Sequence, residues 1–249
     1  MKKEIIGIKQ YPVQSNDVNA QAEMPVWRIA ECLIDAASRH AEAWGFGYQD
    51  LKRYNQAWVL ARLAFDMKRY PSVGDILTVE TWVESVNKAF SSRNFKMSDQ
   101  NGEVLGYGRS IWSIIDFETR QSVELLNYTT IGTLCRELEC PIDRPGRIAP
   151  VKEGDSEWYK VRVSDIDVNR HLTTSKYISH LLDLFPLEKF DREKIYRFEI
   201  QFMSEVYFNE TVQLLNQEVQ EGEFSLELKN EAGLSCCKGK VIFVNCDKV

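Results

Sequence analysis

Residues 165–186, DIDVNRHLTTSKYISHLLDLFP, contain a polar cluster and a helix start around which the chain is organised. In this stretch Asp167, Asn169 and His171 are spaced two residues apart. Successive side chains of an extended segment alternate between faces, so this spacing predicts that the carboxylate, amide and imidazole share one side. Together they could accept, orient and transfer a proton. The competing interpretation is that Asp167 and Asn169 only form a turn before a helix, as short polar residues often do.

A helix is predicted to begin directly after this cluster. Thr173, Thr174 and Ser175 are favourable N-cap residues, and Pro186 lies where the helix is expected to end. Apolar residues follow the N-cap at helical spacing: Tyr177, Ile178, Leu181, Leu182, Leu184 and Phe185. The N-terminal end of a buried helix presents free N–H groups and a partial positive charge, which would stabilise an oxyanion.

The bulk composition limits the class of protein. At 249 residues, with 44% hydrophobic and 27% charged residues, the chain is long enough for one large or two small globular domains. A net charge of −6 provides no overall basic field for nucleic acid or an anionic membrane. No apolar run approaches the roughly 20 residues that span a bilayer, and the N-terminus lacks the apolar core of a signal peptide. We therefore expect a cytoplasmic protein without membrane insertion.

The six cysteines form no CxxC pair and have no histidine nearby at zinc-ligand spacing. Their scatter is typical of reduced, mostly buried thiols. Neither a metal site nor a cofactor is predicted.

The first half of the sequence reads as one strand, one long helix and several further strands. Residues 4–11 resemble a short strand, and an apolar stripe predicts a helix from Val26 to Trp44. From Trp58 onward the period becomes alternating, which predicts antiparallel strands. Residues 139–157 contain three prolines, two glycines and many charges, a composition typical of a linker.

The second half repeats the first. Asp17-Val18-Asn19 precedes the first helix and Asp167-Val168-Asn169 the second, at an offset of 167 − 17 = 150. Near the ends, Gly108-Arg109 matches Gly239-Lys240 at an offset of 239 − 108 = 131. Two copies of one unit are the economical explanation.

A curved antiparallel sheet wrapped around an apolar helix buries the apolar faces of both elements. We therefore predict an α+β double hotdog fold, in which two long apolar helices are each wrapped by a curved antiparallel β-sheet. Its expected parts are an N-terminal hotdog domain (1–138), the linker (139–157) and a C-terminal hotdog domain (158–249).

The two copies differ in one titratable residue. The first copy has Asp17-x-Asn19-x-Gln21, whereas the second has Asp167-x-Asn169-x-His171. Glutamine forms hydrogen bonds but does not titrate near neutral pH. This difference predicts a single active site, located in the second half.

The stretch Asp165–His171 also resembles the D-x-N-x-H block of acyl-acyl carrier protein thioesterases, the plant and bacterial enzymes that end fatty-acid elongation. The first half agrees in the blocks Trp58-Val59-Leu60-Ala61-Arg62, Arg69-Tyr70-Pro71 and Gly74-Asp75. The resemblance extends from about Ile6 to Val244. It implies a double-hotdog thioesterase that hydrolyses the thioester of a long-chain acyl group carried on the phosphopantetheine arm of acyl carrier protein.

The family pattern implies four catalytic positions, which are Asp167, Asn169, His171 and Glu205. Some family members have a cysteine directly after this glutamate, but here that position is Val206, which excludes a Cys–His mechanism. The hypothesis is that Glu205 or His171 polarises an attacking water while Asp167 orients the imidazole and Asn169 binds the oxyanion. Direct attack by Asp167 through a mixed anhydride is the alternative.

The alternation of apolar residues argues against Glu205. Tyr196, Phe198, Ile200 and Phe202 share one strand face, so strict alternation places Glu205 on the opposite one. Three explanations of this placement remain open. A bulge redirects Glu205, the active site lies on the second face, or Glu205 is an ordinary solvated carboxylate.

The resemblance further implies that the N-terminal half binds the acyl chain, with Met24 and Trp27 as substrate-binding residues. A basic rim that steers the acidic carrier protein would draw on Lys88, Arg93, Lys96, Arg144 and Arg147. His180 falls on the polar side of the second helix and is expected to be exposed. A homodimer is left open, because each half could satisfy the pairing surface of the other.

Two other functions fit the same fold. A hotdog enoyl hydratase or dehydratase resembles D-x-N-P-x-H, with the histidine five residues after the aspartate, whereas here the separation is 171 − 167 = 4 and no proline intervenes. A non-catalytic acyl-binding module is the second alternative. Retention of His171 argues against it.

Overall fold

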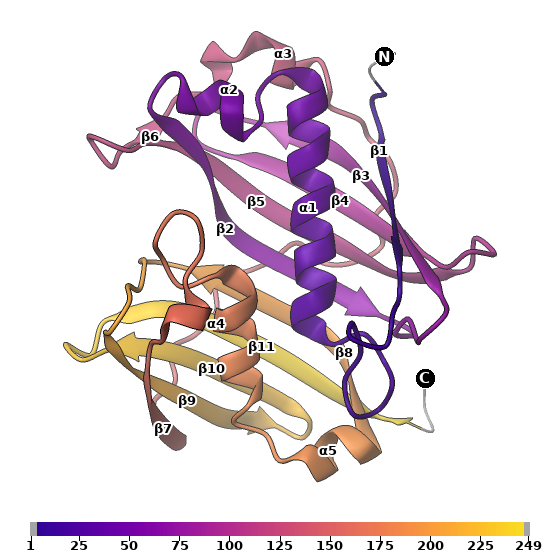
Figure 1. Ribbon diagram of the computed structural model, residues 1–249, viewed down its shortest axis with the longest axis vertical. Helices are drawn as coiled ribbons and strands as arrows, with labels where there is room; N and C mark the ends of the chain where they lie inside the picture. The colour runs from indigo at the N-terminus through magenta and orange to yellow at the C-terminus, as the bar shows by residue number, and fades with distance from the viewer. Residues whose placement is uncertain (1–3, 247–249) are drawn as a thin grey trace.

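The computed structural model describes residues 4–246 and shows two similar halves joined side by side (Figure 1). The strands are β1 (Gly7–Pro12), β2 (Gln56–Met67), β3 (Ile76–Val86), β4 (Ser91–Ser98), β5 (Val104–Asp116), β6 (Ser122–Val123), β7 (Asp155–Lys160), β8 (Glu193–Phe202), β9 (Thr211–Gln220), β10 (Glu223–Asn230) and β11 (Ser235–Asn245). The helices are α1 (Val26–Trp44), α2 (Tyr48–Lys52), α3 (Thr129–Gly132), α4 (Thr174–Leu182) and α5 (Leu187–Arg192), with 3₁₀ turns at Leu125–Asn127 and Val163–Asp165.

All strands form one eleven-stranded antiparallel sheet. Its order is β1-β3-β4-β5-β2-β8-β11-β10-β9-β7, with β6 added to β5. The order of the first five strands recurs in reverse in the last five, as an internal two-fold relation requires. β2 and β8 join the two halves, and α1 and α4 cover the same face of the sheet (Figure 1). The predicted double hotdog fold is confirmed.

Helix α1 follows its apolar stripe closely. It spans nineteen residues, as predicted, and Ile29 and Leu33 on its inner face are fully buried. The helix ends at Gly45, whose φ of 80° is a left-handed conformation that glycine adopts without steric cost.

Helix α4 is shorter than predicted. It has nine residues and ends at Leu182, although the apolar pattern continues to Pro186. The residue before a proline is disfavoured in the helical conformation, and Phe185 instead packs against Phe224 and Phe243 at ring-centroid distances of 5.0 and 5.1 Å. The second half therefore has one short helix over its sheet, followed by the separate helix α5.

The junction between the halves is buried. Phe65 of β2 and Phe198 of β8 lie opposite each other with ring centroids 5.6 Å apart. Beside them the guanidinium of Arg197 donates to Asp66 at 2.6 Å and to Glu199 at 2.8 Å. Apolar packing and charge-assisted hydrogen bonds thus stabilise the same pair of strands.

The connection between the halves packs along the sheet. Residues 139–154 contain no strand, and β7 begins at Asp155, inside the predicted linker. Arg109 donates to the carbonyl of Cys140 at 2.7 Å, and the N–H of Val151 donates to Glu227 at 2.8 Å. Within residues 4–246, no helix has both the length and the apolar character needed to cross a membrane.

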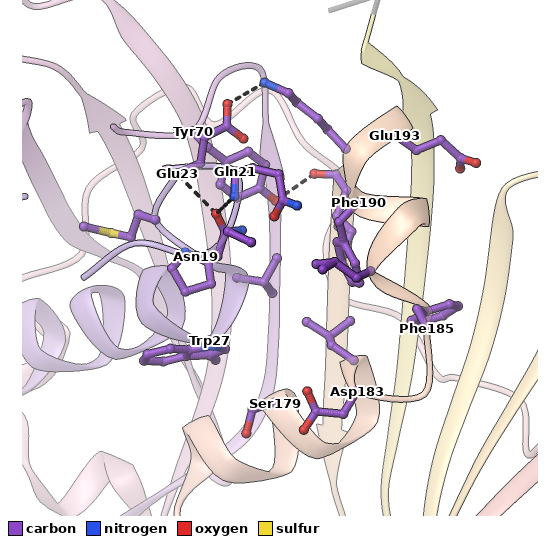
Figure 2. Close-up of a pocket in the computed structure, with 18 residues that line it drawn as sticks. Asn19, Gln21, Glu23, Trp27, Tyr70, Ser179, Asp183, Phe185, Phe190 and Glu193 are labelled. Carbon is purple, nitrogen blue, oxygen red and sulfur yellow. Dashed lines mark hydrogen bonds and ion pairs between the residues drawn. The ribbon is translucent and has the colours of Figure 1, made fainter. Parts of the chain in front are cut away.

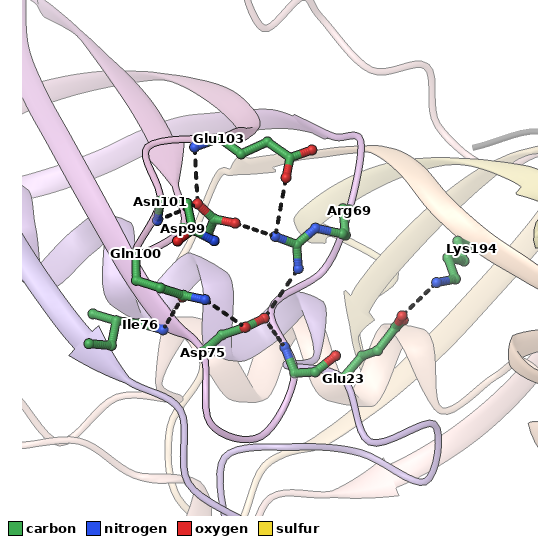
Figure 3. A network of polar contacts seen from close by, with 10 residues as sticks. Glu23, Arg69, Asp75, Ile76, Asp99, Gln100, Asn101, Glu103 and Lys194 are labelled. Carbon is green, nitrogen blue, oxygen red and sulfur yellow. Dashed lines mark hydrogen bonds and ion pairs between the residues drawn. The ribbon is translucent and has the colours of Figure 1, made fainter.

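Arg69 stabilises the connection between β2 and β3 (Figure 3). Its guanidinium donates to Asp75 at 3.2 Å and to Asp99 at 2.7 Å, which joins this connection to the turn between β4 and β5. The next residue, Tyr70, is buried and donates its hydroxyl to the carbonyl of Ile195 at 2.7 Å. The connection is therefore attached to both halves.

Candidate active site

The segment from Asp167 to His171 is a tight turn. One carboxylate oxygen of Asp167 accepts the N–H of Asn169 at 2.8 Å and the N–H of His171 at 3.2 Å. The N–H of Asp167 donates to the carbonyl of His171 at 2.9 Å, and Arg170 has a φ of 68°. The expectation that the three side chains line one face of an extended segment is therefore wrong. The backbone instead forms the turn that the competing interpretation predicted. In this turn, Asp167 stabilises the loop that carries His171.

His171 and Glu205 come together in the fold. The Nε2 of His171 lies 3.5 Å from a carboxylate oxygen of Glu205, and the two side chains are 19% and 28% exposed. The imidazole also packs at nearly a right angle to the ring of Tyr207, with centroids 5.1 Å apart. A partly buried imidazole next to a carboxylate can bind, orient and deprotonate a water molecule.

Glu205 does not belong to a strand, which removes the objection from alternation. Strand β8 ends at Phe202, and Glu205 lies in the connection to β9. The N–H of Leu172 donates to the carbonyl of Val206 at 2.8 Å, so this connection is attached to the turn that carries His171. Val206 itself is fully buried in the core.

Two further residues contact Glu205, and sequence reasoning missed both. Arg120 forms an ion pair with the carboxylate, and the hydroxyl of Tyr207 donates to it at 2.7 Å. This hydrogen bond, together with burial, raises the pKa of Tyr207. The spacing of Tyr207 two residues after Glu205 was a usable signal. No sequence signal indicated Arg120, because it reaches the site from the turn between β5 and β6 in the other half.

The first half contains the same turn without the same side chains. The carboxamide oxygen of Asn19 accepts the N–H groups of Gln21 and Glu23, both at 3.1 Å, and the N–H of Asn19 donates to the carbonyl of Glu23 at 2.9 Å. Ala22 has a φ of 58°, matching Arg170. The structural offset is therefore 171 − 23 = 148, two less than the offset of the sequence match.

The counterpart of His171 is thus Glu23, and the assignment to Gln21 was wrong. The N–H of Met24 donates to the carbonyl of Pro71 at 2.8 Å, as Leu172 does to Val206, so the counterpart of Glu205 is Tyr70. The carboxylate of Glu23 is bound by the ammonium group of Lys194 at 2.5 Å. The two halves therefore differ at this position, as predicted, but the residue opposite His171 is Glu23 and not Gln21.

His180 is largely buried, and the expectation that it is exposed was wrong. Its side chain is 12% exposed, and its ring lies against that of Tyr159 with centroids 4.1 Å apart. Its Nε2 lies 3.4 Å from a carboxylate oxygen of Asp165, which is also buried. The cause is the 3₁₀ turn before Ile166, which directs Asp165 toward α4.

One cavity lies between the two halves and another lies within the first half. The first, of about 320 Å³, is lined by Met24 and Trp27 and by none of the four predicted catalytic residues. The second, of about 40 Å³, lies between α1 and the sheet of the first half. Its walls include Ala37, Ala41, Trp58, Arg93 and Trp112.

The predicted basic rim is partly contradicted. Arg93 is buried and donates to Nδ1 of His40 at 3.0 Å, so it cannot contact a partner protein. Lys96 and Arg144 pair with carboxylates, at 2.9 Å from Glu80 and 3.1 Å from Glu84.

Comparison with known proteins identifies the family and the fold. The family model for the acyl-ACP thioesterase N-terminal domain matches residues 7–129, and that for the C-terminal domain matches residues 148–245. A crystal structure of an acyl-ACP thioesterase from Bacteroides thetaiotaomicron is 34% identical, with a TM-score of 0.89 over 96% of this chain and 98% of that one. The 12:0-ACP thioesterase from Umbellularia californica shares the fold at 18% identity, with a TM-score of 0.87 over 97% and 98% of the two chains.

Curated relatives are longer than this chain. Oleoyl-acyl carrier protein thioesterase 1 of Arabidopsis thaliana, a chloroplastic protein, is 24% identical over 86% of this chain and 64% of its own length. The chloroplastic acyl-[acyl-carrier-protein] hydrolase FATB3 of Cuphea viscosissima is 29% identical over 79% of this chain and 51% of its own. With both domain models matched in order across most of its length, the chain belongs to the acyl-ACP thioesterase family.

Proposed function

We propose that the protein hydrolyses the thioester of a long-chain acyl group on acyl carrier protein and releases the free fatty acid. The observation that carries this proposal is the pair formed by His171 and Glu205, 3.5 Å apart and partly buried. Family membership supplies the reaction class. Val206 at the adjacent position provides no thiol, so water is the nucleophile.

In the proposed mechanism, Glu205 and His171 act on one water molecule. Either group accepts the proton as the water attacks the thioester carbonyl, and returns it to the phosphopantetheine sulfur as the carbon–sulfur bond breaks. Asn169 is exposed at the tip of the turn, where its amide can bind the carbonyl oxygen. Helix α4 begins at Thr174, three residues after His171 (174 − 171 = 3), and its first N–H groups add to oxyanion binding.

The role of Asp167 follows from its contacts. One oxygen of its carboxylate accepts two backbone N–H groups, which hold the side chain in the turn and reduce its nucleophilicity. This favours general-base hydrolysis over direct attack by Asp167. Asp167 then orients His171 through the main chain of the turn.

We place the acyl chain in the first half, but at the smaller cavity and not beside the predicted residues Met24 and Trp27, which line the larger one. Arg62 of β2 pairs with Gln201 of β8. Toward the start of β2, Trp58 pairs with Ile114 of β5, and Ile114 pairs with Val123 of β6, next to the turn from which Arg120 reaches Glu205. Trp58 lines the cavity, which must widen to accept a long chain.

The proposed partner is acyl carrier protein, and the proposed compartment is the cytoplasm. All six cysteines are free thiols, as a reducing compartment requires. A homodimer stays an untested prediction, since β2 and β8 already pair the two halves within one chain.

The proposal is tested by steady-state hydrolysis of acyl-carrier-protein substrates of defined chain length. Glu205→Gln, Asp167→Asn and His171→Ala should each lower kcat by about 100-fold or more, because each removes proton transfer or its positioning. Val219→Glu, exposed near the end of β9 and away from the connection that carries Glu205, serves as the control and should behave as wild type. Turnover within a few fold of wild type in both Glu205→Gln and Asp167→Asn would refute the assignment.

A further inference from the structure

The cavity of about 320 Å³ lies between the two halves and away from the catalytic residues (Figure 2). The segment around Asn19–Glu23 and the start of α1 form one side, and the end of α4, helix α5 and the start of β8 form the other. The volume falls at the lower end of the range of small-molecule sites, about 300–1,000 Å³. Nothing in the proposed reaction uses it.

This cavity occupies, in the first copy, the place that the active site occupies in the second. Its walls include Glu23 and Tyr70, the counterparts of His171 and Glu205. The strand register also shows that Glu193 is the counterpart of Trp58. Trp58 pairs with Ile114, and Glu193 pairs with Asn245. Ile114 and Asn245 are separated by 245 − 114 = 131, the offset already found between Gly108 and Gly239. Glu193 lines this cavity where Trp58 lines the other.

The first copy has kept the shape of the site and lost its proton-transfer groups. Asn19 and Tyr70 cannot accept a proton near neutral pH. Glu23 can, but it is bound by Lys194 at 2.5 Å. Most of the other wall residues are apolar: Met24, Pro25, Val26, Trp27, Leu182, Phe185, Leu187, Phe190 and Ile195. Such a cavity can hold an apolar chain without cleaving its head group.

We propose that this cavity is a second, non-hydrolytic binding site for a single acyl chain with an uncharged carbonyl head, such as the acyl-thioester arm. The fatty acid product has the same chain with a carboxylate head. Three carboxylates line the cavity, from Glu23, Asp183 and Glu193. Lys194 pairs with Glu23 at 2.5 Å and Lys189 with Glu193 at 2.7 Å, so the carboxylate of Asp183 leaves the lining with a negative charge. This charge repels a further carboxylate, whereas a neutral carbonyl oxygen can accept from Lys194. The choice of head group, though not the existence of the site, rests on the proposed function.

The probe is an acyl-pantetheine amide, which cannot be hydrolysed, with bromine near the chain end to quench tryptophan fluorescence. Wild type should bind two probes per chain, one in each cavity. Trp27 lines the larger cavity, whereas Trp58 and Trp112 line the smaller one. Trp27→Phe should therefore still bind two probes while losing one component of the quenching. One probe per chain, or quenching unaffected by Trp27→Phe, would overturn the proposal.

A matched pair of surface variants locates the second probe. Leu187 lines the larger cavity and is 57% exposed, so Leu187→Glu adds charge there without disturbing the core. Leu234 is 65% exposed and does not line either cavity. Leu187→Glu should reduce the stoichiometry from two to one, and Leu234→Glu should leave it at two. Equal stoichiometry in the two variants contradicts the assignment.

A brominated fatty acid of the same length tests whether the cavity binds the acyl-thioester arm or the free fatty acid. It should quench Trp27 with at least roughly 10-fold weaker affinity than the amide, because of the carboxylates around the cavity. Equal affinity would overturn the choice of head group. Hydrolysis by wild type and His171→Ala is measured in parallel. An inactive protein that binds two probes refutes the proposed function alone, and an active protein that binds one refutes the second site alone.

Discussion

At the scale of single residues, Glu205 depends on groups from both halves. Tyr207 donates to its carboxylate from the same connection, while Arg120 reaches it from the turn between β5 and β6. Arg120 is 47% exposed, so its contribution is electrostatic positioning in a solvent-accessible place. This residue makes the site a property of the joined halves.

Removing the guanidinium of Arg120 should lower the rate of hydrolysis without abolishing it. We expect Arg120→Ala to lower kcat roughly 10-fold, well short of the loss of about 100-fold for Glu205→Gln. Arg120→Lys keeps a cation beside the carboxylate and should restore most of the activity. Steady-state kcat of both variants and of wild type is the measurement. Equal kcat in Arg120→Ala and wild type would show that the ion pair has no part in the reaction.

Asp167 shows what could be predicted for the site from the sequence. Residue type and spacing indicated the segment in which the carboxylate of Asp167 accepts the backbone N–H of His171. They could not reveal that Asp167 acts through backbone N–H groups, because alternation assumes an extended chain and a left-handed residue at Arg170 converts it into a turn. Arg120 was beyond reach, because its contact joins residues 85 positions apart.

At the scale of the elements, α1 is attached to the sheet by a buried polar pair. The guanidinium of Arg93 in β4 donates to Nδ1 of His40, and the Nε2 of His40 lies 3.2 Å from the carbonyl of Glu4. Burial, reinforced by the charge of Arg93, lowers the pKa of His40 to about 4 from 6.5. His40 is therefore neutral in the folded protein at pH 5 and charged in the unfolded chain.

This pair should make the folded state sensitive to mild acid. Between pH 6.5 and about 4 the unfolded chain binds one more proton at His40, so stability is present above pH 6.5 and is lost as the pH falls. The loss from this group is up to roughly 3 kcal/mol. Urea unfolding at pH 7 and pH 4.5 measures it, and His40→Gln should lose correspondingly less over that interval. The same loss in the variant and in wild type would place the acid sensitivity elsewhere.

The two main helices show which helix limits can be predicted from the sequence of the helix itself. The limits of α1 were predictable, because a continuous apolar stripe and the glycine after it both act within the element. The short α4 was not, since Phe185 leaves the helix to pack with aromatic residues of β10 and β11. The equivalence of Gln21 and His171 failed for a related reason. The sequence match aligned Asp17 with Asp167, whereas the backbone hydrogen bonds align Asn19 with Asp167.

At the scale of the whole molecule, the two halves share one sheet and should unfold together. Phe65 is fully buried at the junction, and Phe65→Ala should lower the free energy of unfolding by about 3–5 kcal/mol. Because β2 pairs directly with β8, we expect protection from amide hydrogen exchange to fall by the same factor in β4 and β10.

Phe95→Ala provides the comparison for that measurement. Phe95 is also fully buried but lies in β4, away from the junction. If the molecule is one cooperative unit, this substitution too should reduce protection in β10. Loss confined to the first half would show that the halves unfold separately.

Covalent fusion of the two halves has a consequence for how such a protein can change over generations. In an assembly of identical subunits, a substitution appears in every subunit, so neither site can be altered alone. Joining the subunits into one polypeptide removes that restriction. Here the connection after β8 carries a glutamate beside a histidine, whereas the connection after β2, on the same backbone, carries a tyrosine near a lysine-bound glutamate. A single gene can thereby evolve a catalyst and a receptor from one ancestral shape.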